Sequence, residues 1–347
     1  MNDRLDLLKT FAPELIVLIE RRYNILRAIS MHQPIGRRLL AEQLSLGERI
    51  VRSELEFFKN QQLLIFEAAG VSLAPECEPL LKQLGEFVHK LRGLVNLEKH
   101  LAQRLLLERV FIVAGDLDQD HDSFRELGKL AGRFIRDAIE EEWVIAVTGG
   151  STMAEVARNI PKTYGKSKIL VVPARGGLGE EVEIQANSIA AEIAHRLGAS
   201  YKLLFVPDGI KSEALEGLLL DHRVQEVITL TKGANLLLHG IGAPQIMAVR
   251  RNFDWQDMLG SLDKKPVGEA FGNYFAADGS VIFATPTVGP TLEELARLKL
   301  VVAVAGGRSK AEAIMSVIKA GFVKVLITDQ GAAQCMQDIL DEKVKIN

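Results

Sequence analysis

Two Gly-Gly turns that each follow an apolar run are the segments of this sequence best suited to holding an anion. Residues 147–156 (VTGGSTMAEV) align without gaps to residues 304–313 (VAGGRSKAEA). Paired glycines let the backbone approach a ligand closely, and the free N–H groups and dipole of the helix that follows favour a phosphate. Either turn alone could be an ordinary helix cap. The candidate phosphate ligands are Gly149, Gly150, Ser151, Thr152 and Lys310.

Other polar side chains in Gly-rich or turn segments extend this set. They are Arg175, Gln185, Arg250, Arg251 and Glu269. Arg175 lies in residues 173–180 (PARGGLGE) and could hold a phosphate through two parallel hydrogen bonds. The alternative is an exposed arginine in a surface loop, and a solvated helix end would equally contain Arg250 and Arg251. Glu269 could accept hydrogen bonds from sugar hydroxyls.

The sequence lacks the residue patterns of catalysis, metal binding and dinucleotide binding. Its seven histidines form no close pair, and Ser-His-Asp order, CxxC, HExxH and GxGxxG are all absent. An isomerase or deaminase acting on phosphosugars would need an acid–base pair, and Glu269 is the only carboxylate among the candidate ligands. The pattern therefore predicts an anion-binding pocket without catalytic groups, with no metal and no cofactor, and such an enzyme is the less favoured alternative.

A second basic set has the spacing of a DNA-binding surface. Its members are Arg37, Arg38, Arg49, Arg52 and Ser53. The last three share one face of a predicted helix over 48–61, opposite an apolar stripe of Ile50, Val51, Leu55 and Phe58. An arginine can donate two hydrogen bonds to a guanine in the major groove. Arg37 and Arg38 could bind backbone phosphates. The alternative is a helical protein-interaction domain with solvated arginines.

The elements around these arginines predict a winged helix-turn-helix over residues 1–75. Helices are expected over 13–31, 37–44 and 48–61, and two short strands, 63–67 and 71–73, flank an Ala-Ala-Gly turn. Between Arg21 and Lys59 eight basic residues face four acids, a local charge of +4 in a chain of net charge −3. This local excess fits double-stranded operator DNA as the partner.

Residues 76–106 predict a linker helix. Leucines and one phenylalanine recur there at alternating spacings of four and three, which is the pattern of a coiled-coil seam. We expect this helix to pair protomers, because a palindromic operator requires a dimer. The alternative is a helix packed on its own domain.

Residues 107–347 predict an α/β domain with a parallel sheet. Apolar runs alternate with amphipathic helical patterns, and polar or Gly-rich loops follow the strand ends, where ligands bind in such sheets. The expected strands are 110–113, 144–147, 169–172, 203–206, 236–238, 301–304 and 323–327.

The composition indicates a cytoplasmic protein. Apolar residues make up 48% of the chain, but no stretch is long enough for a membrane span, and the N-terminus does not read as a signal peptide. The two cysteines, Cys77 and Cys335, have no metal-type spacing and suit a reducing compartment.

Taken together, these segments resemble the SorC family of bacterial transcription repressors over nearly the whole chain. The resemblance lies in residues 35–40 (IGRRLL), 147–150 (VTGG), 173–180 (PARGGLGE), 250–252 (RRN), 269–272 (EAFG) and 305–307 (AGG). It implies a Rossmann-like sugar-binding domain of the phosphosugar-isomerase type. It also implies repression of a glycolytic operon by homodimers that assemble to a tetramer on DNA.

For motifs of this kind the resemblance implies fructose 1,6-bisphosphate as effector, with another sugar phosphate as the alternative. Residues 149–152 and Lys310 would hold one phosphate, while Arg175, Gln185, Arg250 and Arg251 would hold the other and Glu269 the sugar. The sequence departs from the family pattern at Ser151, where threonine is usual, and at Arg308, where a small residue is usual. Arg308 could tighten phosphate binding or crowd it.

The position of Arg52 on the predicted recognition helix generates a direct test. Arg52→Ala should abolish specific operator binding, because the side chain that would read a guanine is removed. The measurement is a binding titration with specific and nonspecific DNA. Unchanged specific affinity would contradict the assignment of this helix.

Overall fold

The computed structural model describes residues 2–163, 168–177, 181–208, 212–251, 254–286 and 288–346. Its contacts divide the chain into two compact units, Met1–Val95 and Asn96–Asn347. Four residues of the motifs named above, Leu178, Gly179, Glu180 and Asn252, lie outside the described residues.

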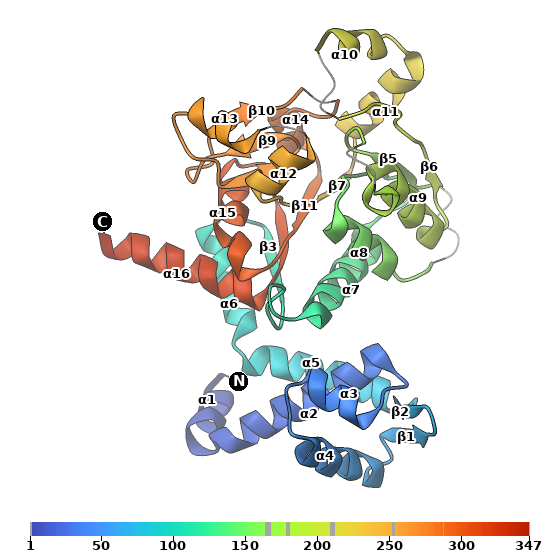
Figure 1. Cartoon of the computed structure of the whole chain (residues 1–347), viewed down its shortest axis with the longest axis vertical. Helices are drawn as coiled ribbons and strands as arrows, with labels where there is room; N and C mark the ends of the chain where they lie inside the picture. The colour runs from blue at the N-terminus through green and yellow to red at the C-terminus, as the bar shows by residue number, and fades with distance from the viewer. Residues whose placement is uncertain are drawn as a thin grey trace. The chain divides into compact units, whose positions relative to one another are not determined.

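The first unit contains the predicted winged helix-turn-helix, preceded by a helix that the sequence pattern did not predict (Figure 1). Three helices and an antiparallel hairpin occupy the expected positions. Each of the three helices ends within one residue of its predicted end. The elements are α1 (Asn2–Phe11), α2 (Pro13–His32), α3 (Arg37–Gln43), α4 (Glu48–Asn60), β1 (Leu64–Glu67), β2 (Gly70–Leu73) and α5 (Cys77–Leu91).

The apolar stripe of α4 packs into the core of this unit. Val51, Leu55 and Phe58 are buried against Ile25 of α2 and Leu40 of α3. Ile50, which the pattern placed on the same stripe, is 41% exposed. It lies in the first turn of α4, one position off the buried stripe, so the prediction for this residue was wrong.

The predicted linker helix over 76–106 is two helices. α5 ends at Leu91, and α6 (Leu94–Arg104) begins after Gly93. Gly93 adopts φ +72° and its N–H binds the Lys90 carbonyl, a left-handed ending that stops a helix. Leu80 and Phe87 on α5 are exposed, as a protomer contact would require. Pairing of protomers through this region stays a prediction.

The second unit is built on a seven-stranded parallel sheet with the order β3-β12-β11-β7-β4-β5-β6. After β4 the chain moves to one side through β5 and β6, then crosses to place β7 on the other side of β4. Ligands bind at such a switch point, outside the carboxyl ends of the strands. The strands are β3 (Arg109–Val113), β4 (Val144–Val147), β5 (Leu170–Pro173), β6 (Ser200–Tyr201), β7 (Leu236–His239), β11 (Leu300–Val304) and β12 (Val325–Asp329).

Helices cover both faces of this sheet, as the buried runs predicted. In β4, β7 and β11 successive residues are buried, so neither face meets water. One face packs against α7 (His121–Ala138), α8 (Ser151–Asn159) and α9 (Ala186–Leu197), which lie side by side (Figure 1). The remaining helices are α10 (Ser212–Leu218), α11 (His222–Lys232), α12 (Pro244–Arg250), α13 (Trp255–Gly260), α14 (Leu292–Arg297), α15 (Ala311–Lys319) and α16 (Gln330–Ile346), with 3-10 turns η1 (Val182–Ile184) and η2 (Arg308–Lys310). Among the helices so described, none is long and apolar enough to cross a bilayer.

The run 203–206 was predicted as a strand and is not one. Leu204 and Val206 are buried while Phe205 is 76% exposed, which is the alternation of a half-buried extended segment. The backbone of Leu204 bonds to the side chain of Asn187 in place of a neighbouring strand. The adjacent strand β6 comprises Ser200–Tyr201 only.

A small antiparallel sheet carries Glu269, and sequence patterning missed it. Its strands are β8 (Gly268–Ala270), β9 (Asn273–Phe275) and β10 (Val281–Ala284), in the order β10-β9-β8. Its first two strands are shorter than the runs that periodicity can detect. This sheet places Glu269 beside Gly242, in the loop after β7.

Close contact between α7 and α8 generates a prediction about stability. A Cβ on Gly132 would lie 2.6 Å from the backbone oxygen of Asn159. Gly132→Ala should therefore lower the free energy of unfolding by about 2 kcal/mol, the usual cost of overpacking. Gly217→Ala in α10 is the matched control, since a Cβ there meets nothing within 4 Å. Urea melts of both variants measure the difference, and equal stability would contradict this packing.

Candidate functional site

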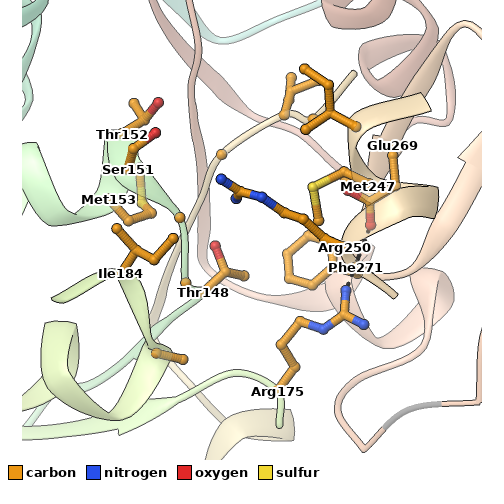
Figure 2. Close-up of a pocket in the computed structure, with 18 of the residues that line it drawn as sticks. Thr148, Ser151, Thr152, Met153, Arg175, Ile184, Met247, Arg250, Glu269 and Phe271 are labelled. Carbon is orange, nitrogen blue, oxygen red and sulfur yellow. Dashed lines mark ion pairs between the residues drawn. The ribbon is translucent and has the colours of Figure 1, made fainter. Parts of the chain in front are cut away.

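A cavity of about 640 Å³ lies at the carboxyl ends of β4, β5, β7 and β11 (Figure 2). It occupies the switch point between β4 and β7. All ten residues that sequence patterning proposed as effector ligands line it, namely Gly149, Gly150, Ser151, Thr152, Arg175, Gln185, Arg250, Arg251, Glu269 and Lys310. That they bind a ligand stays a prediction.

The first Gly-Gly turn presents the start of α8 to this cavity. A Cβ on Gly149 would lie 2.7 Å from the carbonyl oxygen of Ile184, so only glycine allows that segment to approach. The Gly150 N–H bonds to the same carbonyl, and the Ala154 N–H bonds to the Gly150 carbonyl. Between them, the first-turn N–H groups of residues 151–153 have no partner within the helix. This end of the cavity can therefore bind an anion.

Two cations face the same end. Figure 2 shows Arg250 reaching from the end of α12 across the cavity towards Ser151 and Thr152. Lys310 lines the cavity from η2. Within the described ranges neither forms an ion pair with a carboxylate. Burial lowers the pKa of Lys310 and the charge of Arg250 lowers it further, against the opposing effect of Asp118 and Asp329. An anion between the two cations would relieve their repulsion.

The opposite, inner end of the cavity contains two arginines that are already paired. The Arg175 Nη2 atom lies 2.6 Å from each carboxylate oxygen of Asp208, and its Nη1 atom lies 3.7 Å from Glu269 Oε1. Arg251 donates to Glu269 at 2.8 Å and to the Tyr274 hydroxyl at 3.1 Å. All four charged side chains are less than a tenth exposed. Two arginines and two carboxylates leave this end without net charge.

The pairing keeps Arg251 charged and gives Glu269 a structural role. Burial lowers the pKa of Arg251, but the carboxylates of Glu269 and Asp208 raise it by more, and it ends above the usual arginine value. Glu269 Oε1 also accepts the Gly272 N–H at 2.7 Å. Glu269 Oε1 therefore already accepts two hydrogen bonds from the protein, and the predicted contact with sugar hydroxyls falls to its second oxygen.

The second Gly-Gly turn is not an anion site, although its sequence matches the first. The protein's own carboxylates occupy its N–H groups. Asp329 accepts from Gly307, and Asp118 accepts from Ser309 at 2.7 Å. Arg308 lies 3.8 Å from Asp116 and does not line the cavity, so it neither tightens nor crowds the site. Of this turn, Lys310 alone lines the cavity.

Asp208 is the charged residue of this network that sequence reasoning missed. It lies in the segment after β6, and its backbone N–H bonds to the Gly177 carbonyl at 2.8 Å. A carboxylate that closely follows the apolar run 203–206 was the available signal. Its partner Arg175 lies 33 residues away, which no local pattern reveals. Met247 and Phe271, two of the apolar lining residues, were also not predicted.

In the first unit all five predicted DNA-contacting residues are exposed. They are Arg37, Arg38, Arg49, Arg52 and Ser53. Arg37 and Arg52 line a shared hollow of about 290 Å³ with Lys59, between α4 and the hairpin β1–β2. Arg37 and Arg38 each lie 3.9 Å from Glu48, a weak exposed contact that a DNA phosphate can replace. The geometry suits a basic surface against a duplex.

Two of the arginines counted in the local charge of +4 form ion pairs that stabilise the packing of α2 on α4. Arg21 and Arg22 of α2 pair with Glu54 at 2.6 and 2.8 Å, and Glu54 is 5% exposed. The Arg22 guanidinium also lies 3.6 Å from the Phe57 ring centre. The ion pairs of Arg21 and Arg22 with Glu54 hold α2 against α4. The excess positive charge on the exposed surface therefore comes from the outward-facing arginines.

Two family models match the chain in succession. The CggR N-terminal DNA binding domain matches residues 18–88. A sugar-binding domain family matches residues 89–337, which is most of the chain.

Two curated relatives are similar over almost the full length. The central glycolytic genes regulator of Bacillus subtilis is 39% identical over 334 residues, 96% of this chain and 98% of that protein. The protein of the same name from Priestia megaterium is 39% identical over 335 residues, 96% and 98% of the two chains.

Solved structures of regulators share the fold. A SorC family transcriptional regulator from Enterococcus faecalis has a TM-score of 0.65 at 37% identity, covering 70% of this chain and 99% of its own. The full-length sorbitol operon regulator SorC from Klebsiella pneumoniae has a TM-score of 0.63 over 93% of this chain and 99% of its own. At 16% identity the second shows the fold alone.

The two neighbouring arginines at the end of α12 should differ in their effect on stability. Arg251→Ala leaves buried carboxylates without a counter-charge and should lower the free energy of unfolding by about 3 kcal/mol. Arg250→Ala should change it by less than about 0.5 kcal/mol, because Arg250 is exposed. Chemical denaturation of both variants without ligand measures this, and equal losses would contradict the network.

Proposed function

Because this chain belongs to the SorC family of sugar-binding transcriptional regulators, we propose that it is a repressor of glycolytic genes whose operator binding responds to fructose 1,6-bisphosphate. The effector occupies the cavity at the switch point. Both curated relatives carry the name of central glycolytic genes regulator, which supports glycolytic genes as the target.

One observation carries the proposal for the effector. Two cations without carboxylate partners among the described residues, Arg250 and Lys310, face the open first turn of α8 inside one cavity. Charge-assisted hydrogen bonds from such groups are the strongest that a phosphate can accept. One phosphate of the effector binds there.

The rest of the cavity accommodates a sugar with a second anionic end. Gln185 lines the cavity from the start of α9, where its amide nitrogen donates to the Glu181 carbonyl at 3.3 Å. Glu269 retains a second carboxylate oxygen for hydroxyl donors. Arg175 and Arg251 lie at the inner end, 2.6 to 3.7 Å from the carboxylates that neutralise them. A second phosphate meets arginine donors there, but against the charge of Asp208 and Glu269.

Operator DNA is the second partner. The outward residues of α4, Arg49, Arg52 and Ser53, enter the major groove, while Arg37 and Arg38 contact phosphates. A homodimer places two such helices on a palindromic operator, and two dimers form a tetramer on DNA. The exposed Leu80 and Phe87 of α5 support contact between protomers.

A different sugar phosphate is the remaining alternative for the effector. The enzyme alternative is excluded, because the close relatives are named transcriptional regulators and a DNA-binding domain matches this chain. The effector is distinguished by comparing fructose 1,6-bisphosphate with fructose 6-phosphate in thermal melting and in release of labelled operator DNA. If the monophosphate matches the bisphosphate in both assays, the two-phosphate proposal fails.

Lys310 should be required for the effector response. At a hundredfold excess over Kd, a single-site ligand stabilises the folded state by about 2.7 kcal/mol. Lys310→Ala should lose most of the melting shift at the same concentration of bisphosphate, because one cation leaves the phosphate end. Arg308→Ala removes the same charge two residues away, outside the cavity, and should respond as the unmodified protein does. An unaltered response of Lys310→Ala would remove this residue from the site.

A further inference from the structure

The inner end of the cavity has a charge balance that depends on a residue outside the cavity lining. Arg175, Arg251 and Glu269 line the cavity, whereas Asp208 does not. Asp208 holds both oxygens against Arg175 Nη2 and lies 3.4 Å from Arg251 Nε. Its side chain has no exposed surface, so solvent ions screen its charge weakly.

The backbone fixes Asp208 in this place. The Gly177 N–H bonds to the Val206 carbonyl at 2.9 Å, and the Asp208 N–H bonds back to the Gly177 carbonyl at 2.8 Å. The loop that carries Arg175 and the segment that carries Asp208 are therefore tied together two residues from each charge.

Arg175 keeps donor capacity that Asp208 does not use. Its Nε atom is buried and has no hydrogen-bond partner among the residues that the structure describes. An unpartnered buried donor on a residue that lines the cavity is consistent with an acceptor supplied by a ligand. The carboxylate of Asp208, which neutralises the same guanidinium, weakens the attraction of this donor for an anion.

We propose that Asp208 is a specificity-determining residue that limits how strongly the cavity prefers a bisphosphate over a monophosphate. This inference rests on the proposed function, and it concerns the second phosphate only. The first phosphate binds at the end of the cavity that holds two cations and the start of α8. The second approaches arginines whose charge Asp208 and Glu269 cancel, so its contribution to affinity is held below what two free arginines would give.

Asp208→Asn tests this by removing the charge and keeping the shape. Arg175 and Arg251 would then carry one uncompensated positive charge at the inner end. Calorimetric titration of the full chain should show the ratio of fructose 6-phosphate Kd to fructose 1,6-bisphosphate Kd rising about tenfold, which corresponds to 1.4 kcal/mol. Glu226→Gln is the control, since it removes one negative charge from an exposed ion pair with Lys202. That ratio should stay unchanged in the control.

Glu269→Gln supplies an independent variant if Asp208→Asn does not fold. It removes the other carboxylate, and its amide oxygen can still accept the Gly272 N–H. Any loss of sugar contacts affects both ligands alike, so the ratio should rise here too. A folded variant of either kind whose ratio is unchanged or lower overturns the role of the inner carboxylates. Failure of the unmodified protein to bind either ligand overturns the proposed function itself.

Discussion

The pairing of two buried arginines with two buried carboxylates is the interaction on which the cavity at the switch point depends. Arg175 comes from the loop after β5, Asp208 from the segment after β6, Arg251 from the end of α12 and Glu269 from β8. Two buried arginines this close would repel each other strongly in a medium of low dielectric constant. The carboxylates remove that repulsion and fasten four separate segments around one end of the cavity. The other end, where Arg250 and Lys310 have no such partners among the described residues, is left positive.

The fold class and most elements could be predicted from the sequence, because strands buried on both faces give short apolar runs and these alternate with amphipathic helical patterns. The same rule failed at 203–206, where the run is equally apolar but Phe205 faces solvent and the backbone bonds to the Asn187 side chain. It also could not find β8, because Gly268–Ala270 is three residues long and owes its burial to neighbours distant in sequence. Periodicity reports which residues are buried along a segment, and it does not report what covers them.

The candidate site divides in the same way. The candidate ligands converge because the loops at the carboxyl ends of parallel strands meet at one edge of the sheet. Charge pairing could not be predicted, since Arg175 and Asp208 are brought together by the fold alone. The two Gly-Gly turns make the point most clearly. Their sequences align without gaps, yet Asp118 and Asp329 accept hydrogen bonds from the N–H groups of the second turn. The N–H groups at the start of α8, after the first turn, have no such carboxylate partner among the described residues.

Two sets of residues lie on opposite faces of α4, and Glu54 belongs to the inner one. Its carboxylate, held by Arg21 and Arg22, anchors the inner face of α4, while Arg49, Arg52 and Ser53 on the outer face take no part in the core. Residues that hold the helix in place are thus distinct from residues that can meet base edges. New operator preferences can therefore arise in such a domain by exchange of a few outward side chains, with no compensating change in its interior. For the same reason, the outward-facing residues of α4 could be replaced by those of a related regulator without disturbing the core.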